Sequence, residues 1–476
     1  MKLELEELKT KSILILGLGV EGISTLRFLL ELFPDKALGV ADLGPLERLD
    51  AEAQRIIASD PRIVQHFGDN YLGFLERYDL IIKTPGISIV NHPEIRRAFE
   101  AGKLTSHTAL FFANCPGTII GVTGTKGKGT TSKLIHSMLK AGGVDAHLVG
   151  NIGNPPLPLL GQTGKSSVFV FELSAQQLEI LDRSPHIAVL LNIVPDHLDH
   201  FATFENYVQA KENIVRFQTG LDYLIYNPAF PIPGRIADQA ISKLIPCSIE
   251  GALDRGCFIE NGHVICRLGE TEESVALDDV SAVLPGAFNL HNVVPAVAAA
   301  KLAGLGDGQI IEGIRSFKPE EHRFERVGTF RGITFYNASI ATVPEVTIEH
   351  LKSLGDDVQT MLLGGFDRGM DFGPLAKLIA QSEVRTVILF PETGRRIWEA
   401  LSSRSSESSG ELPQHFFIDG SAGAEGAMKE AVRLAYLHTS AGKICLHSPA
   451  SPSFGVFKNY KERGQLFKRF VRELGV

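Results

Sequence analysis

The chain has 476 residues, which is too many for a single domain with one hydrophobic core, because domains usually contain about 100–200 residues. Its 47 Lys and Arg against 55 Asp and Glu give a net charge of −8, which excludes a basic surface for nucleic acid or an anionic membrane. No run approaches the roughly 18 apolar residues of a membrane-spanning helix, and the first residues do not resemble a signal peptide. The five cysteines form no CxxC pair, so we expect buried thiols in a cytoplasmic protein rather than a disulfide framework.

Three segments of the chain repeat one order: an apolar run, a glycine-rich turn and a stretch with helical periodicity. They span residues 12–33, 118–142 and 359–380. This order is typical of βα units, so the sequence predicts an α/β fold with parallel sheets. The apolar runs 168–172, 187–194 and 386–390 predict further buried strands.

Two other segments depart from this pattern. Residues 243–283 carry short alternating runs that predict a small antiparallel hairpin, and the Ser-rich run 402–411 predicts a polar loop. Proline and glycine near residues 114–117 and 317–321 mark candidate boundaries. We therefore expect three domains, at residues 1–115, 116–318 and 319–476.

The glycine-rich turn at 121–131 follows a predicted strand and opens a predicted helix. Such a turn directs backbone N–H groups at phosphate oxygens, and Lys128 would reach the terminal phosphates. The turn departs from the common phosphate-loop pattern because Gly129 stands where a Ser or Thr would bind Mg²⁺, and Thr130 follows one residue later. A plain glycine-rich turn is the alternative interpretation.

The first turn, at residues 17–22, matches G-x-G-x-x-G after a predicted strand. Asp42 lies where an acidic residue would meet a ribose hydroxyl in a dinucleotide-binding fold. Nicotinamide binding and simple tight packing both remain open from this segment alone.

Motifs along nearly the whole chain resemble those of the Mur ligase family. Phe171–Glu179 resembles its ELSSFQLE segment, Asn192–Asp199 resembles NVTEDHMD, and Tyr207–Lys211 resembles YRAAK. Gly150–Gly153 and His322–Glu325 also match. The ending at 457–464, preceded by Ser-Pro-Ala at 448–450, is similar to that of the glutamate-adding members.

The resemblance implies a Rossmann-like N-terminal domain that binds a UDP substrate, a central P-loop-type ATPase domain and a Rossmann-like C-terminal domain that binds glutamate. It also implies a ligase that uses ATP to join glutamate, the D-isomer in the main family pattern, to UDP-N-acetylmuramoyl-L-alanine in cytoplasmic peptidoglycan precursor synthesis. The expected cofactors are ATP and two Mg²⁺ ions, with a carbamoylated Lys211. We expect a monomer whose partners are these small molecules.

The family motifs also assign site residues. The implied catalytic residues are Lys128, Glu172, His197 and Lys211, of which the last three would hold the metal ions. The implied ATP-binding residues are Gly124, Thr125, Lys126, Gly127, Lys128, Gly129, Thr130, Asn292 (adenine) and Arg323. The implied UDP-substrate residues are Gly17, Leu18, Gly19, Asp42, Thr84, Pro85, Gly86 and Asn151. The implied glutamate-binding residues are Thr342, Arg368, Ser453 and Tyr460.

Several residues differ from the glutamate-adding pattern around the nucleotide. Ala338 replaces an acid near the ribose and Ile340 replaces a lysine. Phe288 replaces a histidine, and Lys126 replaces an asparagine of the phosphate loop. These changes leave open a Mur-like protein that binds nucleotide sugar with impaired turnover.

Arg368 replaces a lysine expected to hold a glutamate carboxylate. Arginine keeps the charge and adds a bidentate fork, so carboxylate recognition is retained with changed geometry. An L-glutamate-adding variant of the ligase is therefore a second alternative. A folate-type polyglutamate ligase is a third, although the first domain and the chain's last motif argue against it.

Overall fold

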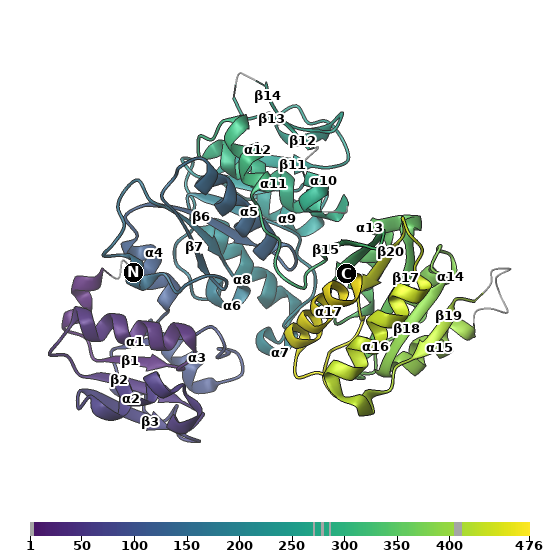
Figure 1. The fold of residues 1–476 in the computed structure, drawn as a ribbon. Coiled ribbons are helices and arrows are strands. Elements are labelled where there is room, and N and C mark those ends of the chain that lie inside the picture. Colours follow the sequence, from purple (N-terminus) through teal and green to yellow (C-terminus); the bar gives the residue numbers. More distant parts are fainter. Residues whose placement is uncertain (1–3, 270–271, 278–279, 285–286, 404–411) are drawn as a thin grey trace. The chain divides into compact units, whose positions relative to one another are not determined.

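The computed structural model describes residues 4–269, 272–277, 280–284, 287–403 and 412–476 (Figure 1). These form two compact units, Met1–Val280 with Leu290–Phe317 and Ser281–Asn289 with Lys318–Val476. Each unit is built from sheets and helices, which confirms the predicted α/β class. The predicted polar loop at 402–411 lies almost wholly outside the described residues, and the three domain boundaries remain a prediction.

The N-terminal sheet of the first unit has five parallel strands in the order β3-β2-β1-β4-β5. The strands are β1 (Ile13–Leu16), β2 (Leu38–Asp42), β3 (Ile63–Phe67), β4 (Leu80–Lys83) and β5 (Leu104–Thr105). The helices are α1 (Val20–Leu32), α2 (Ala51–Ser59), α3 (Pro93–Glu100) and α4 (His107–Asn114). Strand order reverses at β1, so the carboxyl ends of β1 and β4 form the switch point where such sheets bind ligands.

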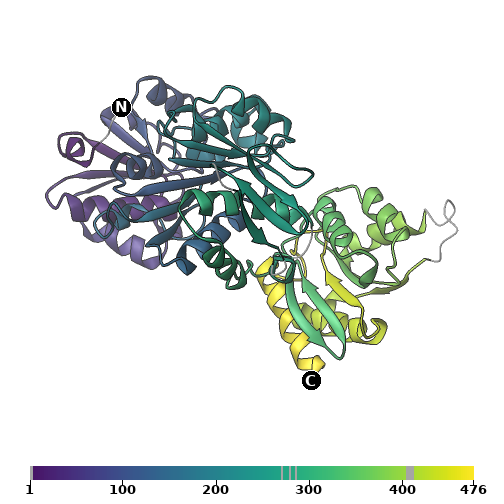
Figure 2. The same ribbon diagram turned by 90° about the horizontal axis from the view of Figure 1, so that it is seen from above.

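The central sheet has nine strands in the order β14-β13-β12-β11-β10-β9-β6-β8-β7, which are coloured blue to green in Figure 2. The strands are β6 (Thr118–Thr123), β7 (Ala146–Gly150), β8 (Val168–Glu172), β9 (Ile187–Leu190), β10 (Tyr223–Tyr226), β11 (Lys243–Ser248), β12 (Gly256–Glu260), β13 (His263–Arg267) and β14 (Glu272–Ala276). Those from β6 to β12 pair in parallel, whereas β12, β13 and β14 pair antiparallel. The hairpin predicted over 243–283 is therefore confirmed for residues 256–276 and wrong for β11, which pairs in parallel.

The helices of the central part are α5 (Lys128–Ala141), α6 (Ala175–Leu178), α7 (Leu198–Phe201), α8 (Phe204–Arg216), α9 (Pro231–Ala237), α11 (Leu290–Leu302) and α12 (Asp307–Arg315). One prediction is corrected: the strand expected over 187–194 ends at Leu190. The following residues leave the sheet because they hydrogen-bond the glycine-rich turn, where the Asn192 carbonyl oxygen accepts from the N–H of Thr125 at 2.6 Å.

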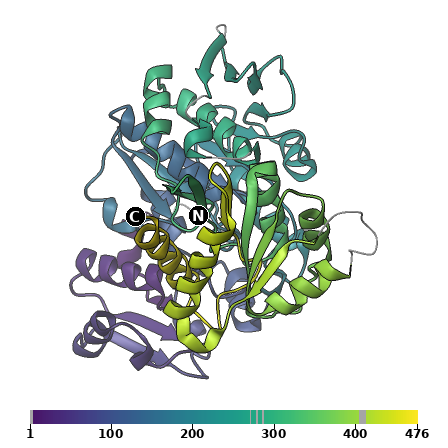
Figure 3. The ribbon, with the colours of Figure 1, turned by 45° about the vertical axis from the view of Figure 1, so that its right-hand side comes forward.

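The six-stranded sheet of the second unit has the order β15-β16-β20-β17-β18-β19, in which only β15 and β16 pair antiparallel. The strands are β15 (Glu325–Phe330), β16 (Ile333–Asn337), β17 (Val358–Gly365), β18 (Thr386–Glu392), β19 (Gln414–Phe417) and β20 (Ile444–His447). The helices are α10 (Val280–Val283), which begins at the unit boundary, α13 (Pro344–Leu354), α14 (Gly373–Ala380), α15 (Thr393–Ser402), α16 (Gly423–His438) and α17 (Tyr460–Gly475). One apolar cluster lies under α13–α15 and a separate one lies under α16 and α17. Helices α16 and α17 lie side by side in Figure 3.

Two further expectations concern the cysteines and the membrane. All five cysteines are free thiols; four are buried as predicted, whereas Cys115 is half-buried. Within the described ranges, none of the helices combines the length and the apolar character needed to cross a membrane.

Close packing fixes the helix that follows the glycine-rich turn. α12 crosses α5 at Gly313, where an added Cβ would lie 2.3 Å from the Cα of Met138. Real Cβ atoms do not approach backbone so closely, so a side chain at residue 313 would push the two helices apart.

We expect Gly313→Ala to destabilise the first unit by about 1–3 kcal/mol, because this overpacking outweighs the gain in helix propensity. Thermal unfolding measures the effect. Gly308→Ala on the same helix is the matched control, since a Cβ there meets open space and should leave the melting temperature unchanged or slightly raised. Equal stability of the two variants would contradict this packing account.

Candidate active site

The glycine-rich turn between β6 and α5 is the centre of the site. The N–H of Lys126 donates to Asn192 Oδ1 at 3.0 Å, and the Thr125 hydroxyl donates to the Val194 carbonyl oxygen at 3.0 Å. Thr130 lies in the first turn of α5. Hydrogen bonds to residues after β9 therefore fix the conformation of the turn. The amino end of a 14-residue helix follows the turn, as an anion-binding loop requires.

Two glycines of the turn adopt positive φ and have no room for a side chain. Gly124 has φ of 154° and Gly127 has φ of 85°. A Cβ on Gly127 would lie 2.1 Å from Asn292 Oδ1, so the predicted adenine-contacting residue packs against the predicted phosphate loop. The Lys128 ammonium folds back on the turn and donates to the carbonyl oxygens of Gly124 and Thr125, both at 3.1 Å.

Lys211 lies beneath the same turn. It projects from α8 and is 1% exposed. Its Nζ donates to the Gly124 carbonyl oxygen at 2.9 Å and to Thr123 Oγ1 at 3.2 Å, and lies 4.8 Å from the centre of the Tyr207 ring. Burial and the nearby Lys128 charge lower the pKa of Lys211 well below its ordinary value, against the opposing effect of two nearby carboxylates.

The predicted carboxylate ligand, Glu172, is 3% exposed at the carboxyl end of β8. Its Oε1 accepts from the side-chain amide of Asn151 at 3.3 Å, so a residue predicted to bind the UDP substrate contacts one predicted to bind metal. Gly129 lies opposite: a Cβ there would make only an ordinary van der Waals contact, with Glu172 Oε2 at 3.8 Å. The missing side chain thus leaves room beside the carboxylate.

His197 precedes α7 in the left-handed conformation, with φ of 52°. Its ring is half exposed, and Nε2 lies 3.9 Å from Asp196 Oδ2. Non-glycine residues in this conformation are uncommon and cluster at functional sites. The strained backbone supports a functional role for His197.

In the described part of the chain, no three His, Cys, Asp or Glu side chains are arranged to hold a metal ion by themselves. The predicted set differs from such a cluster because it contains Lys211 and relies on phosphate oxygens. Carboxylate and phosphate oxygens suit Mg²⁺, which usually keeps few protein ligands. The chemistry of Glu172 beside the phosphate loop fits this ion.

The predicted UDP-substrate residues other than Asn151 meet at the switch point of the N-terminal sheet. Gly17 follows β1 with φ of 90°, and a Cβ on it would lie 2.0 Å from Thr84 Oγ1, just after β4. Asp42 accepts hydrogen bonds from the N–H groups of Leu18 at 2.7 Å and Gly44 at 2.8 Å. The structure therefore brings the Gly17–Gly19 turn, Asp42 and the Thr84–Gly86 turn together.

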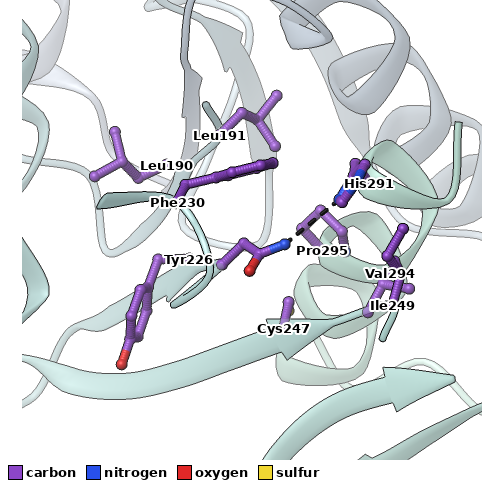
Figure 4. Close-up of a pocket in the computed structure, with 10 residues that line it drawn as sticks. Leu190, Leu191, Tyr226, Phe230, Cys247, Ile249, His291, Val294 and Pro295 are labelled. Carbon is purple, nitrogen blue, oxygen red and sulfur yellow. Dashed lines mark hydrogen bonds between the residues drawn. The ribbon is translucent and has the colours of Figure 1, made fainter. Parts of the chain in front are cut away.

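A small apolar pocket lies between α11 and the carboxyl ends of β9–β11 (Figure 4). His291 lines it, with its ring centre 5.2 Å from that of Phe230 and its Nδ1 3.4 Å from the side-chain amide nitrogen of Asn227. These contacts fix the first turn of α11. Asn292, the next residue, is thereby held on the phosphate-loop side of that helix.

The second unit carries the predicted glutamate-binding residues on neighbouring loops and at the first residue of α17. The N–H of Phe366 donates to the Pro452 carbonyl oxygen at 2.9 Å, which joins the Arg368 loop to the Ser453 loop. The Ser339 hydroxyl donates to the Tyr460 carbonyl oxygen at 2.8 Å, three residues from Thr342. The guanidinium of Arg323, predicted to bind ATP phosphates, contacts Glu320 in this unit.

Sequence reasoning missed a buried organiser of these loops, Arg463. Its guanidinium donates to the hydroxyl and carbonyl oxygens of Ser339 at 3.0 and 2.8 Å and to the Ser451 carbonyl oxygen at 3.0 Å. A Cβ on Gly365 would lie 3.1 Å from its Nη1. One arginine thus contacts the three segments that precede Thr342, Arg368 and Ser453. The sequence feature that could have revealed this role is the position of Arg463 in the final motif, 457–464.

Two departures from the family pattern, Phe288 and Ala338, have local explanations. Phe288 packs against the rings of Phe324 and His350, with centroids 5.9 and 6.2 Å apart, so an apolar ring suits this position. Ala338 is fully buried and its N–H donates to the His447 carbonyl oxygen at 2.7 Å. An acid at residue 338 would be buried here.

Comparison with known proteins agrees with this arrangement. Residues 122–300 match the Mur ligase middle domain, and residues 11–105 match the Mur ligase MurD-like N-terminal domain. A UDP-N-acetylmuramoylalanine–D-glutamate ligase of Acetivibrio thermocellus is 33% identical over 98% of both chains. A protein of the same name from Symbiobacterium thermophilum is 35% identical over 97% of both. The chain belongs to the Mur ligase family.

Solved structures support the fold of this Mur ligase. MurF from Acinetobacter baumannii aligns with a TM-score of 0.61 at 15% identity, covering 96% of this chain and 93% of that one. MurC from Thermotoga maritima aligns with a TM-score of 0.55 at 17% identity, covering 98% and 99%. The fold predicted from the motifs is confirmed.

For this Mur ligase we expect Gly129→Ser to strengthen Mg²⁺-dependent binding of ADP by about fivefold, equivalent to about 1 kcal/mol, because the hydroxyl adds an oxygen ligand beside Glu172. Calorimetric titration of ADP at several Mg²⁺ concentrations measures this. Gly129→Ala supplies the same Cβ without the hydroxyl and should bind ADP as the natural protein does. A gain shared by both variants would assign the effect to the helix instead.

Proposed function

We propose that this chain is an ATP-dependent ligase that joins D-glutamate to UDP-N-acetylmuramoyl-L-alanine, a step of peptidoglycan precursor synthesis. The single observation that carries the proposal is the meeting of Lys128, Glu172 and Lys211 at one phosphate loop, with Asn151 of the nucleotide-sugar set on Glu172. The substrate follows from the relatives' printed name, at 31–35% identity along almost the whole chain.

The reaction joins a carboxylate and an amine, and a carboxylate is a poor electrophile. An oxygen of the alanyl carboxylate attacks the γ-phosphorus of ATP, and ADP leaves, giving an acyl phosphate. The amine of glutamate then attacks the acyl carbon, and inorganic phosphate leaves as the amide forms. Lys128 would bind the γ-phosphate and Arg323 would add a second cation for the charge that develops on it.

The proposed metal ions are two Mg²⁺, which when bound neutralise phosphate charge and polarise the phosphorus–oxygen bonds. Glu172 would hold one, and His197 with a carbamoylated Lys211 would hold the other. The burial of Lys211 supports this assignment, because a neutral amine is the form that reacts with CO₂. The carbamate would supply an oxygen ligand where lysine has none.

The adenine, UDP and glutamate sites are assigned to the residues that the family motifs imply. Asn292 beside Gly127 would contact adenine, and the turns at Gly17–Gly19 and Thr84–Gly86 with Asp42 would hold the UDP group. Thr342, Arg368, Ser453 and Tyr460 would bind glutamate. The guanidinium of Arg368 is exposed and makes no ion pair with any described residue, so it is available for a carboxylate. We propose that the enzyme acts as a cytoplasmic monomer.

Release of phosphate with ATP, Mg²⁺ and UDP-N-acetylmuramoyl-L-alanine tests the proposal, with D-glutamate and L-glutamate compared. We expect turnover with D-glutamate. Turnover with L-glutamate alone would overturn the isomer, and turnover with a folate substrate would overturn the substrate class. Silence of a folded protein that binds the nucleotide sugar would make it a binding protein rather than a ligase.

Replacing the buried lysine tests the carbamate. We expect Lys211→Ala to lower kcat at least about 100-fold, because a metal ligand is lost, and formate or acetate to restore part of it by occupying the vacated space. Steady-state phosphate release measures both. Glu212→Gln, the neighbouring residue on the outer side of α8, is the control and should retain full activity. Full activity of Lys211→Ala would remove this lysine from the site.

A further inference from the structure

Lys83 is a buried charge to which neither the motifs nor the comparisons give a role. We infer that it is a positioning residue: through Glu179 and His200 it fixes the turn that binds the nucleotide sugar to the segment that carries His197. The inference rests on the proposed function, because it concerns how that substrate is presented to the same site.

On one side, Lys83 organises the turn that follows it. It is the last residue of β4 and is 1% exposed. Its ammonium donates to the Ile87 carbonyl oxygen at 2.7 Å and to the Thr84 carbonyl oxygen at 3.3 Å. One cation thus closes both ends of the Thr84–Ile87 turn, which contains three of the predicted UDP-substrate residues.

On the other side, Lys83 faces the central part of the same unit. Its ammonium lies 3.5 Å from Oε2 of Glu179, the residue that ends α6. The same carboxylate oxygen lies 3.5 Å from Nε2 of His200 in α7. Both Glu179 and His200 are nearly buried. The carboxylate therefore joins a residue of the N-terminal sheet to the short helix that begins directly after His197.

Two further hydrogen bonds tie the same segments together. The Ser88 hydroxyl donates to the His200 carbonyl oxygen at 2.6 Å, and the Asn91 amide donates to the Asp199 carbonyl oxygen at 2.9 Å. Residues 83–91 therefore contact α7 in two ways: through Glu179 to the His200 side chain, and by hydrogen bonds to two backbone carbonyl oxygens of α7. A shift of the turn that binds UDP would move the segment carrying His197.

A structural role alone does not explain the charges. A buried ion pair contributes little net stability, and replacing both partners by apolar residues of similar size is often neutral or stabilising. What the pair supplies is a defined geometry between two segments. Stability and substrate binding should consequently respond differently when both charges are removed.

The experiment compares Lys83→Met, Glu179→Gln and the double variant Lys83→Met/Glu179→Leu with the natural enzyme. Calorimetry with UDP-N-acetylmuramoyl-L-alanine, without ATP, gives its Kd, and phosphate release gives KM for each substrate. We expect Lys83→Met to weaken binding of the nucleotide sugar about 10-fold or more, with KM for ATP within about twofold. The double variant should melt near the natural temperature yet bind the nucleotide sugar no better than Lys83→Met.

Lys103→Met is the matched control. Lys103 also holds a turn by donating to carbonyl oxygens, of Tyr78 at 2.9 Å and Glu76 at 3.3 Å, but at the amino end of β4. The Lys103→Met variant should leave Kd for the nucleotide sugar unchanged.

An unchanged Kd in folded Lys83→Met or in the folded double variant would overturn the inference, as would equal losses for ATP and nucleotide sugar. If Lys83→Met does not fold, the double variant decides; failure of both to fold would assign Lys83 to stability and overturn the inference too. Failure of the natural protein to bind or turn over the nucleotide sugar would instead refute the proposed function.

Discussion

The site depends on one desolvated amine, that of Lys211. A lysine that is 1% exposed and bonded to the Gly124 carbonyl oxygen fixes the phosphate loop from below. The cost of burying its charge favours the neutral form, which is also the form able to take up CO₂. The same contact therefore shapes the loop and would, under the proposed carbamoylation, supply a metal ligand; both depend on the packing of α8.

The loop is held equally closely from above. Gly127 admits the Asn292 amide only because it lacks a side chain, and His291 fixes that helix turn in its apolar pocket. Asn192, at the point where the predicted strand ends early, accepts from Lys126. The phosphate loop is thus a meeting point of β6, β9, α8 and α11, and its conformation is set by tertiary contacts as much as by its glycines.

Periodicity and glycine turns were enough to predict the α/β class, the repeated βα units and the antiparallel strands near residues 256–276, because these patterns are local. The early end of β9 was not predictable, since an apolar run does not reveal that its last residues bond another loop. For the same reason the sequence does not reveal that Lys83 and Arg463 are buried, although Arg463 lies in the final motif. Their burial arises from segments more than ninety residues away, Glu179 for the first and Ser339 for the second. The roles of individual site residues came from family motifs and remain predictions.

The most direct test of this account is the chemical state of Lys211. Carbon-13 NMR of the protein equilibrated with ¹³C-bicarbonate should show a carbamate resonance in the natural enzyme that is missing from Lys211→Ala. It should also disappear when bicarbonate is removed and return when it is restored. A folded, active enzyme with no such resonance would contradict the account, because Lys211 would then act as a buried ammonium and another group would have to hold the second metal ion.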